Sequence, residues 1–350
     1  MKKIAVVGTV GIPACYGGFE SLVENLTFYK SEEVTYTVFC SSKSYKSKLQ
    51  EHNNAKLIYI PLNANGIQSV VYDIFSLFKC YFLKPDAILI LGVSGCCFLP
   101  FLRLFSKAKV ITNIDGLEWK RDKWGNFAKW FLKKSESIAV KNSDIVVTDN
   151  KAIEEYVDEE YGIRPVTIAY GGDHAIRNIK VQPSTDSYAL GLCRIEPENN
   201  VEMILESFSK SEFNLKFIGN WNSSDFGIAL KERYQKCHNI DLLDPIYDLN
   251  ILYSIRKNCS VYLHGHSAGG TNPSLVEMMH FQVPILAYDC SFNRYSTDNM
   301  ANYFSSSDDL IDIINSLDFD KLNANALSMF KIANEKYTWL NISEKYEQLF

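Results

Sequence analysis

The residues best suited to chemistry lie at 264–279, which read His-Gly-His-Ser-Ala-Gly-Gly-Thr-Asn-Pro-Ser-Leu-Val-Glu-Met-Met. An apolar strand precedes this loop, and an apolar helix follows it from Pro273, a residue that suits the first turn of a helix. We expect the N–H groups of Ser274 and Leu275 to point outward at the positive end of the helix dipole, where a diphosphate would bind. Glu277 follows about one turn later and is placed to accept hydrogen bonds from ribose hydroxyls. The segment therefore predicts a nucleotide diphosphate site.

Two other segments carry groups that suit a bound phosphate. Gly17 and Gly18 follow the first predicted strand, and we expect them to open a helix at 18–30 whose N–H groups approach the diphosphate from the opposite side of a cleft. A plain structural turn is the alternative for these glycines. Arg194 ends a predicted strand at 188–192, where its planar guanidinium could pair with the diphosphate. A surface salt bridge is the alternative for Arg194.

The segment from Asn113 to Trp124 follows a predicted strand at 109–113 and combines acids, tryptophans and cations. Open parallel sheets bind ligands at the carboxyl ends of their strands, which is where this segment begins. Aromatic faces stack on sugar rings and carboxylates bind hydroxyls, so the composition predicts a sugar-binding loop. A solvated charged loop is the alternative. The residues that we expect to bind an acceptor sugar are Asp115, Glu118, Trp119, Lys120 and Arg121.

The next segment, 126–134, mixes aromatic and cationic side chains within a predicted helix at 127–141. Its aromatic residues are Phe127, Trp130 and Phe131, and its cations are Lys129, Lys133 and Lys134. This mixture favours an interfacial helix that rests on an anionic membrane. A core helix whose lysines extend to solvent is an equal alternative.

Composition sets limits on the class of protein. The chain has 350 residues, 47% of them hydrophobic and 22% charged, with a net charge of −5. This length predicts two domains, and the charge gives no reason to expect a nucleic-acid partner. The first residues run straight into a predicted strand at 3–7, so we expect no secretory signal. The apolar run at 87–105 is broken by glycines, Pro100 and Arg103, so we expect a strand, a loop and a short helix there.

Neither the cysteines nor the histidines predict a metal centre. The nine cysteines form no Cys-x-x-Cys pair, which favours reduced thiols in a cytosolic protein over a disulfide framework or a zinc site. His264 and His266 stand two residues apart without a nearby third ligand. A structural or hydroxyl-binding role is therefore favoured for this pair, and no metal is expected.

Strand and helix signals alternate along the chain in two series, which predicts an α/β protein with two Rossmann-like parallel sheets. We expect an N-terminal domain at 1–175, a C-terminal domain at 176–332, and a final helix at 333–350 that packs back at the domain junction. Strands are expected at 3–7, 34–40, 57–60, 87–91, 109–113, 144–148, 166–168, 188–192, 214–218, 259–263 and 284–287. Helices are expected at 18–30, 127–141, 151–160, 199–209 and 274–281.

The glycine-rich loop at 8–20 could also belong to a dinucleotide-binding fingerprint. It is too long for that motif, and Pro13 interrupts it. The second strand ends in Cys40-Ser41-Ser42, where an acid for the ribose of NAD is expected. A nicotinamide-dependent epimerase or reductase is therefore disfavoured, and no cofactor is expected.

At this point the motifs resemble a known family. Gly17-Gly18-Phe19-Glu20, Arg194-x-x-Pro197-Glu198 and the loop at 264–279 are similar to retaining glycosyltransferases of family 4, which have the GT-B fold of two domains facing each other across a cleft. The segments 11–20, 113–121 and 265–277 resemble more closely the bacterial rhamnosyltransferases of capsule and surface polysaccharide synthesis. That resemblance implies a dTDP-L-rhamnose donor and a lipid-linked saccharide acceptor. It implies a cytoplasmic protein, peripheral at the inner face of the membrane.

The chain departs from the broader family at three positions. Asn199 stands where a Lys usually follows the phosphate-binding Arg, and Gly269 stands where a second Glu usually precedes Glu277. Asp115 takes the place of a catalytic-loop His. These changes fit a donor sugar other than glucose, such as a 6-deoxy sugar, and they make 264–271 the segment where we expect donor identity to be decided.

The resemblance implies a metal-independent mechanism in which the leaving phosphate deprotonates the acceptor on the same face of the sugar. Arg194 would neutralise the diphosphate, while Asp115 and Glu118 would orient hydroxyls. A UDP-hexose donor and a non-catalytic sugar-nucleotide-binding protein are the alternatives. The donor-binding residues expected on this basis are Gly17, Gly18, Arg194, Asn199, His266, Gly270, Thr271, Asn272, Ser274, Leu275 and Glu277.

Overall fold

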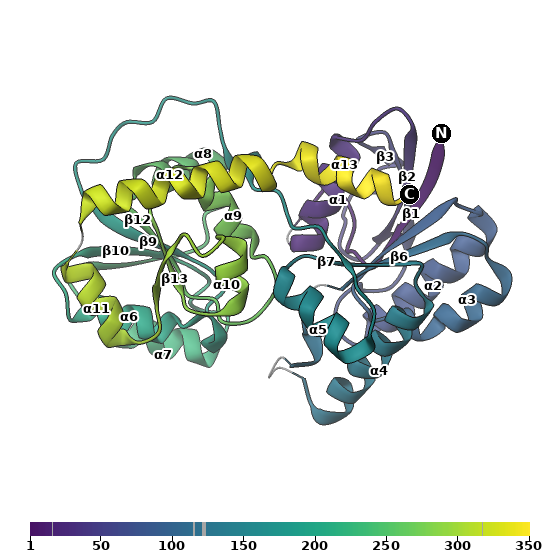
Figure 1. Cartoon of the computed structure of the whole chain (residues 1–350), viewed down its shortest axis with the longest axis horizontal. Coiled ribbons are helices and arrows are strands. Elements are labelled where there is room, and N and C mark those ends of the chain that lie inside the picture. Colours follow the sequence, from purple (N-terminus) through teal and green to yellow (C-terminus); the bar gives the residue numbers. More distant parts are fainter. Residues whose placement is uncertain (16, 115, 121–123, 317) are drawn as a thin grey trace. The chain divides into compact units, whose positions relative to one another are not determined.

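The structure, a computed structural model, describes residues 1–15, 17–114, 116–120, 124–316 and 318–350. It divides into two compact units (Figure 1), the first formed by Met1–Tyr170 with Trp339–Phe350 and the second by Gly171–Thr338. The chain thus leaves the first unit shortly before the boundary expected after residue 175 and returns to it for its last helix. Among the described residues, no helix is long and apolar enough to cross a membrane.

The first unit contains a sheet whose strands follow the order β3-β4-β2-β1-β5-β6-β7-β8. All neighbouring strands are parallel except β3 and β4, which pair antiparallel. The central strand β5 is buried along its whole length because helices cover both faces of a parallel sheet. The strands are β1 (Lys2–Val7), β2 (Val34–Ser41), β3 (Glu51–His52), β4 (Ala55–Ile60), β5 (Ala87–Leu91), β6 (Lys109–Ile114), β7 (Ile145–Thr148) and β8 (Val166–Thr167).

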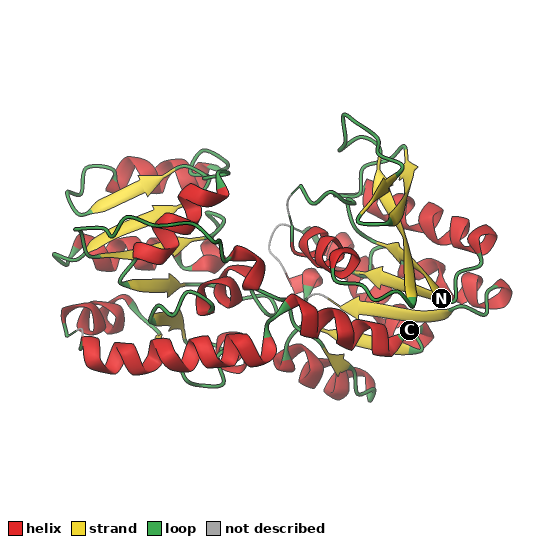
Figure 2. Cartoon of the chain, turned by 90° about the horizontal axis from the view of Figure 1, so that it is seen from above, coloured by secondary structure: helices red, strands yellow, loops and turns green. Residues whose placement is uncertain are grey.

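Helices flank this sheet, as the view in Figure 2 shows. A crossover between parallel strands usually contains a helix of this kind. The helices of the first unit are α1 (Gly18–Phe28), α2 (Gln68–Leu83), α3 (Leu99–Phe105), α4 (Asn126–Asn142), α5 (Lys151–Tyr161) and the C-terminal α13 (Trp339–Leu349), with a 3₁₀ turn at Glu118–Lys120.

The second unit contains a fully parallel sheet in the order β11-β10-β9-β12-β13-β14. Its strands are β9 (Tyr188–Leu192), β10 (Asn214–Ile218), β11 (Ile240–Leu243), β12 (Val261–His264), β13 (Ile285–Tyr288) and β14 (Asn302–Phe304). Its helices are α6 (Val201–Ser209), α7 (Asp225–Tyr234), α8 (Leu249–Asn258), α9 (Pro273–Met279), α10 (Ser291–Ser296), α11 (Ser307–Asn315) and α12 (Phe319–Lys336), with 3₁₀ turns at Asp173–Ala175 and Pro197–Asn199.

Each sheet has one place where the strand order reverses direction. In the first unit, β1 lies between β2 and β5, and in the second unit β9 lies between β10 and β12. Loops that leave neighbouring strands in opposite directions open a crevice at such a point, and ligands of doubly wound sheets bind there. The loops after β1, β9 and β12 are therefore the places to look for a site.

The sequence-based assignment of elements is largely confirmed, and its errors have physical causes. The short strands β3, β11 and β14 lie at or next to sheet edges, where few buried positions reveal them. The single helix expected at 333–350 is instead the end of α12 and the separate helix α13, which joins the first unit.

Candidate functional site

In the second unit, the loops after β9 and β12 emerge side by side. The two strands pair in parallel, with Leu263 opposite Gly191. Their carboxyl ends lie at the reversal point of the sheet, which is the ligand-binding position of this architecture. The fold therefore brings Arg194, which follows β9, to the same edge as the 264–279 segment.

Arg194 presents a guanidinium that is about half exposed. Its Nη1 lies 3.5 Å from Glu196 Oε1, and 51% of the Arg194 side chain is accessible. An exposed pair of this kind contributes little free energy, so a phosphate can replace the Glu196 carboxylate. Asn199, expected to contact the donor directly, is buried, and its Nδ2 donates to the Arg194 carbonyl oxygen at 2.8 Å. Asn199 thus shapes the loop that carries Arg194.

The loop after β12 is fixed by amide side chains from other elements. Asn200 Nδ2 donates to the Gly265 carbonyl oxygen at 2.8 Å, and Asn293 Nδ2 donates to the His266 carbonyl oxygen at 2.9 Å. A Cβ atom on Gly265 would come within 2.3 Å of the Asn199 carbonyl oxygen. The two loops therefore touch through their backbones, and a larger residue at 265 would push them apart.

The imidazoles of His264 and His266 stack on each other at the end of β12. Their ring centroids lie 4.3 Å apart with an interplanar angle of 14°. Burial lowers the pKa of both rings, with a further contribution from His266 at His264 and from Arg194 at His266; the pKa of His266 falls to about 3. Both rings are therefore neutral near pH 7. Each has one donor and one acceptor nitrogen in that state.

His264 has unmet hydrogen-bonding capacity inside the protein. The side chain is fully buried, and within the described part of the chain neither of its ring nitrogens has a partner, nor does Nδ1 of His266. Buried polar atoms normally find partners, so an unsatisfied pair beside a loop calls for a water or a ligand hydroxyl. This favours the hydroxyl-binding role expected for the histidine pair.

Helix α9 begins as the proline predicted, but its first turn differs from expectation. Asn272 stands at the N-cap with Pro273 next to it. The Leu275 N–H donates to the Asn272 carbonyl oxygen at 3.1 Å, so it is engaged within the turn instead of pointing outward to a phosphate. The phosphate contact expected of Leu275 stays a prediction. Thr271 is buried and Gly270 is partly exposed beside this turn.

Glu277 is the carboxylate of helix α9, which follows the β12 loop. Its Oε2 lies 2.5 Å from Nη2 of the buried Arg256 on α8, and its Oε1 lies 3.4 Å from Nε2 of His174. Burial alone would raise the pKa of Glu277, but Arg256 and His174 outweigh it and lower the pKa to about 2. The carboxylate is therefore ionised, and its remaining lone pairs can accept hydrogen bonds from hydroxyls.

Sequence reasoning did not identify Arg256 or His174. Arg256 lies in the last turn of a helix and reads as a surface cation, yet its side chain is 8% accessible. His174 sits in the turn that opens the second unit. A Cβ atom on the neighbouring Gly172 would come within 2.5 Å of the Val276 carbonyl oxygen, so this turn packs tightly on α9. That tight packing, invisible in the sequence, brings His174 to Glu277.

In the first unit, the loop after β1 is closed by an acid from α1. Oε1 of Glu20 accepts hydrogen bonds from the Thr9 hydroxyl at 2.9 Å and from the Val10 N–H at 2.7 Å. Gly17 adopts a φ of 128°, and a Cβ there would lie 2.1 Å from Glu20 Oε2. Glycine is thus required at 17 for conformation and space. Gly18 opens α1 as expected, and the phosphate contact of both glycines stays a prediction.

The loop after β6 is described in part, because Asp115 and Arg121 lie outside the described residues. Glu118 accepts a hydrogen bond from Nε1 of Trp124 at 3.0 Å, while Lys120 is exposed. Nε1 of Trp119 is buried, with no hydrogen-bond partner among the described residues, so this donor could serve an acceptor hydroxyl. The acceptor roles of all five residues stay predictions.

The side chain of Lys133 lies among three aromatic rings and a carboxylate. We call this group the lysine cage; its residues are Lys133, Trp119, Glu136, Tyr156 and Tyr161. The Lys133 ammonium lies 4.8 Å from the Trp119 ring centroid, 4.7 Å from that of Tyr156 and 5.0 Å from that of Tyr161. Oε1 of the buried Glu136 accepts hydrogen bonds from both tyrosine hydroxyls at 2.6 Å. Lys133 is therefore engaged by this group, although 29% of its side chain stays accessible.

Among the described residues, no group of three or more His, Cys, Asp and Glu side chains could hold a metal ion. The polar residues of the second unit instead combine a half-exposed cation, two neutral imidazoles and an ionised carboxylate at one sheet edge. A cation suits phosphate, and a carboxylate and imidazoles suit hydroxyls. Chemically, this edge can bind a phosphorylated sugar or nucleotide.

Comparison with known families agrees with this chemistry. Residues 173–317 match the family described as Glycosyl transferases group 1, and residues 1–173 match a family described as Domain of unknown function (DUF1972). No curated protein is similar to the chain in sequence at a significant level.

Solved structures share the fold across the whole chain at low sequence identity. Sucrose-phosphate synthase from Thermosynechococcus elongatus has a TM-score of 0.82 at 14% identity, covering 100% of this chain and 98% of that one. HepE from Anabaena in complex with UDP-glucose has a TM-score of 0.75 at 12% identity, covering 99% of both chains. A glycosyltransferase from Rickettsia africae has a TM-score of 0.74 at 14% identity, covering 99% of this chain and 98% of that one.

These matches support one class of protein. Residues 173–317 match a glycosyl transferases group 1 domain, and the two parallel-sheet units have the GT-B fold. Together they support a glycosyltransferase.

Proposed function

Starting from this group 1 glycosyltransferase domain, we propose that the protein is a retaining enzyme that transfers L-rhamnose from dTDP-L-rhamnose to a lipid-linked saccharide. The product would enter bacterial capsule or exopolysaccharide synthesis. The observation that carries the donor site is the ionised Glu277, which Arg256 and His174 hold at the sheet edge that also carries Arg194. Glu277 would bind the nucleoside sugar hydroxyl, and Arg194 would bind the diphosphate.

The partners of Glu277 leave it able to bind the sugar of a nucleotide. A carboxylate offers about four lone-pair positions. Arg256 and His174 each occupy one, on opposite oxygens. The remaining positions can accept the single free hydroxyl of the deoxyribose of dTDP or the two hydroxyls of the ribose of UDP. The choice of dTDP therefore rests on the resemblance of the sequence motifs, and Glu277 is compatible with it.

The sugar subsite would be formed by the histidine pair and the glycines after it. Gly269 adopts a φ of 119°, a conformation that L side chains rarely adopt. An acid at this position, usual in the resembled family, would be strained here. Neutral His264 and His266 would then contact the sugar in place of a second carboxylate, which suits a 6-deoxy sugar with one hydroxyl fewer to bind.

The difficult step is departure of the nucleoside diphosphate. Charge develops on its bridging oxygen as the glycosidic bond breaks, and preorganised cations stabilise that charge most effectively. Arg194 would supply this stabilisation, and the leaving phosphate would accept the proton of the acceptor hydroxyl on the same face. Asp115 and Glu118 would orient hydroxyls. Trp119, whose indole N–H has no partner within the described part of the chain, would contact the acceptor sugar.

A lipid-linked acceptor requires the enzyme to reach a membrane, so we place the protein peripherally on an anionic bilayer. Helix α4 supports this in part, since Phe127 and Trp130 at its start are exposed. Lys133 of the same helix is turned inward to the lysine cage. Lys134 is exposed. The contact would therefore need more cationic surface than α4 provides.

The experiment that tests the proposed donor compares nucleotide sugars on the purified full-length chain. Thermal unfolding and slow donor hydrolysis would be measured with dTDP-L-rhamnose, dTDP-glucose, UDP-glucose and UDP-galactose at equal concentrations. We expect dTDP-L-rhamnose to raise Tm most and to be hydrolysed fastest. A larger effect of a UDP-hexose would overturn the donor assignment but leave the class intact. Binding without turnover of any donor would favour a sugar-nucleotide-binding protein.

A UDP-hexose donor remains the second candidate, and one specific observation favours it. The structure of HepE, similar in fold over 99% of this chain, holds UDP-glucose. Identity of 12% transfers the fold and not the donor. The relative effects of dTDP-L-rhamnose and UDP-glucose on Tm and on the rate of donor hydrolysis therefore decide between the two donors.

A further inference from the structure

Helices α2 and α3 expose large apolar side chains that the fold does not cover. On α2 and its N-cap, exposed positions recur every three or four residues, which places them on one side of the helix. Monomeric proteins rarely leave contiguous apolar patches of this kind without an interaction partner. We call this group the aromatic face; its residues are Ile67, Val71, Phe75, Phe78, Tyr81 and Phe82 from α2, and Phe101, Leu104 and Phe105 from α3.

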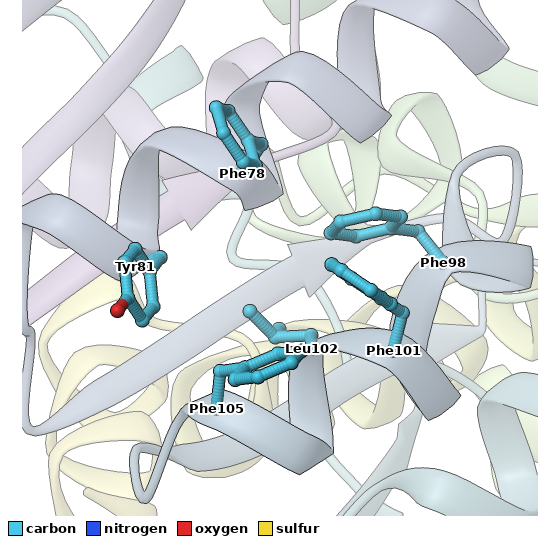
Figure 3. Close-up of a pocket in the computed structure, with 6 residues that line it drawn as sticks. All are labelled: Phe78, Tyr81, Phe98, Phe101, Leu102 and Phe105. Atoms are coloured by element: carbon cyan, nitrogen blue, oxygen red, sulfur yellow. The ribbon is translucent and has the colours of Figure 1, made fainter.

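The rings of the aromatic face contact each other within and between the two helices. The centroids of Tyr81 on α2 and Phe105 on α3 lie 6.4 Å apart, those of Phe78 and Phe82 5.4 Å, and those of Phe101 and Phe105 5.0 Å. Figure 3 shows a hollow between the helices with a volume of about 210 Å³, which is lined by Phe78, Tyr81, Phe98, Phe101, Leu102 and Phe105. Phe78, Tyr81, Phe82, Phe101 and Phe105 thus form one continuous apolar cluster at the centre of the face.

Cations surround this surface, and free acids do not. Lys79 lies on α2 between the exposed rings, Lys84 follows α2 and Lys107 follows α3; all three are exposed. Within 66–84 and 92–109, all of them described, the sequence contains one acid, Asp73, which is 4% exposed. Burial raises the pKa of Asp73 well above its ordinary value, which favours the uncharged form.

Asp86, which follows α2, and Asp144, which pairs with Arg103 of α3, both have partners. Oδ2 of Asp86 accepts a hydrogen bond from the Lys3 N–H at 2.8 Å. Oδ2 of Asp144 lies 2.7 Å from Nη2 of Arg103 and accepts a hydrogen bond from the Val110 N–H. The aromatic face therefore carries a positive rim, and its partner should be apolar with negative charge at its boundary.

We propose that the aromatic face docks the enzyme on the surface of an anionic phospholipid bilayer. Aromatic rings would enter the headgroup boundary, and Lys79, Lys84 and Lys107 would face the phosphates. The biological reason for this docking rests on the proposed function, which includes a lipid-linked acceptor. The docking surface itself is inferred from the geometry and charge of the aromatic face. A symmetric second copy fits less well, because a two-fold interface would bring the same lysine rims against each other.

A comparison of the aromatic face with helix α4 favours the aromatic face as the membrane contact. Lys133 is enclosed by the lysine cage, which leaves the exposed pair Phe127 and Trp130 with Lys134. The aromatic face offers more exposed rings and a rim of lysines without free acids. The two surfaces can be separated by substitution.

Vesicle flotation of the full-length protein tests the proposal. Wild-type protein should float with phosphatidylcholine vesicles that contain about one third phosphatidylglycerol, and bind pure phosphatidylcholine at least about tenfold less. The double variant Phe82→Ser/Leu104→Ser, which changes side chains that are 66% and 74% exposed, should lose this binding at unchanged Tm. The matched control Tyr247→Ser/Leu327→Ser changes exposed apolar residues of the second unit and should bind as wild type.

A second pair of variants guards against misfolding and separates the two surfaces. Lys79→Gln/Lys107→Gln leaves every ring in place and should weaken binding to anionic vesicles about tenfold or more. Phe127→Ser/Trp130→Ser should leave most of the binding intact. Absence of wild-type binding at low salt, or loss of binding in the α4 variant alone, would overturn the proposal.

Two further readouts distinguish this inference from its alternatives. Light scattering would reveal a dimer that Phe82→Ser/Leu104→Ser dissociates without affecting flotation, and that result would assign the face to a second copy and overturn the proposal. Nucleotide-sugar binding and donor hydrolysis should be the same in this variant and in wild type. If flotation behaves as expected while no nucleotide sugar binds, the proposed function fails and the docking surface stands.

Discussion

Each unit of the molecule holds a carboxylate within a polar network, and the two are held in different ways. Glu277 in the second unit lies between Arg256 and His174 at the carboxyl edge of its sheet, and its side chain is 14% accessible. Glu136 in the first unit lies in mid-helix, is 2% accessible, and accepts hydrogen bonds from two tyrosine hydroxyls. Glu277 pairs with Arg256 and stays partly accessible to solvent. Glu136 is almost inaccessible and is bonded to the hydroxyls of two aromatic side chains.

This difference separates a binding group from a structural one. Near Glu277 lie the half-exposed Arg194 loop and imidazole nitrogens that have no partner within the described chain. Around Glu136, Lys133 and both tyrosines are bonded to each other and to the carboxylate. Unsatisfied polar groups and an accessible charge indicate a place for a ligand, whereas a complete network indicates a brace.

The largest effect is expected at Arg194. Arg194→Ala should lower kcat for donor hydrolysis about 10²–10³-fold, since it removes a cation from the developing diphosphate charge. Tm should hardly change, because the side chain is half exposed and only loosely paired. Arg233→Ala, at an exposed Arg of the same unit that pairs with Glu202, is the matched control and should keep full activity. Equal activity of both variants would remove Arg194 from the mechanism.

The second prediction uses the pKa of Glu277, which is lowered to about 2 in the folded state from an ordinary value of 4.5. The stabilisation is fully present above about pH 4.5 and is lost as pH falls toward 2, up to about 3 kcal/mol in all. Unfolding of wild type and Glu277→Gln should be followed by urea titration across this range. The variant should show a flatter acid limb. Identical acid limbs would show that Glu277 is not held by Arg256 and His174.

The third prediction concerns the closed carboxylate. Glu136→Gln keeps an oxygen for the tyrosine hydroxyls but removes the charge opposite Lys133, which still has Glu160 at 2.9 Å. We expect a loss of about 1–2 kcal/mol of unfolding free energy with donor hydrolysis unchanged. A donor-specific defect at unchanged Tm would contradict its role as a brace.

The smallest effect is expected at the histidine pair. His266→Ala removes a neutral imidazole that is stacked on His264, and it should change the ratio of kcat/KM between dTDP-L-rhamnose and UDP-glucose by about tenfold. Competition between the two donors in one reaction measures this ratio directly. An unchanged ratio would place donor choice elsewhere in the loop.

The sequence predicts the framework of the site well. Strand and helix periodicity locates β9, β12 and α9, and the proline at 273 locates the start of α9, so the edge that carries Arg194 and Glu277 follows from local patterns. Parallel strands put their carboxyl ends together, and this rule needs no long-range information.

What the sequence does not reveal depends on contacts between distant segments. Arg256 looks like a surface residue until α8 packs against α9, and His174 reaches Glu277 through a turn that no periodicity marks. The Leu275 N–H is engaged by a detail of the first helical turn. The apolar residues of α2 and α3 look like core positions in the sequence, and only the packed structure leaves them exposed.

The central claim is that Glu277 is a nucleotide-binding carboxylate, and calorimetric titration of the full-length chain with dTDP, dUDP and UDP tests it most directly. We expect Glu277→Gln to weaken dTDP binding about tenfold or more, because a buried charged acceptor for the sugar hydroxyl is lost. The matched variant Glu136→Gln should bind as wild type. dTDP should bind wild type at least as tightly as UDP, with dUDP separating the effect of the 2′-hydroxyl from that of the thymine methyl. Equal dTDP affinity of wild type and folded Glu277→Gln would contradict the claim.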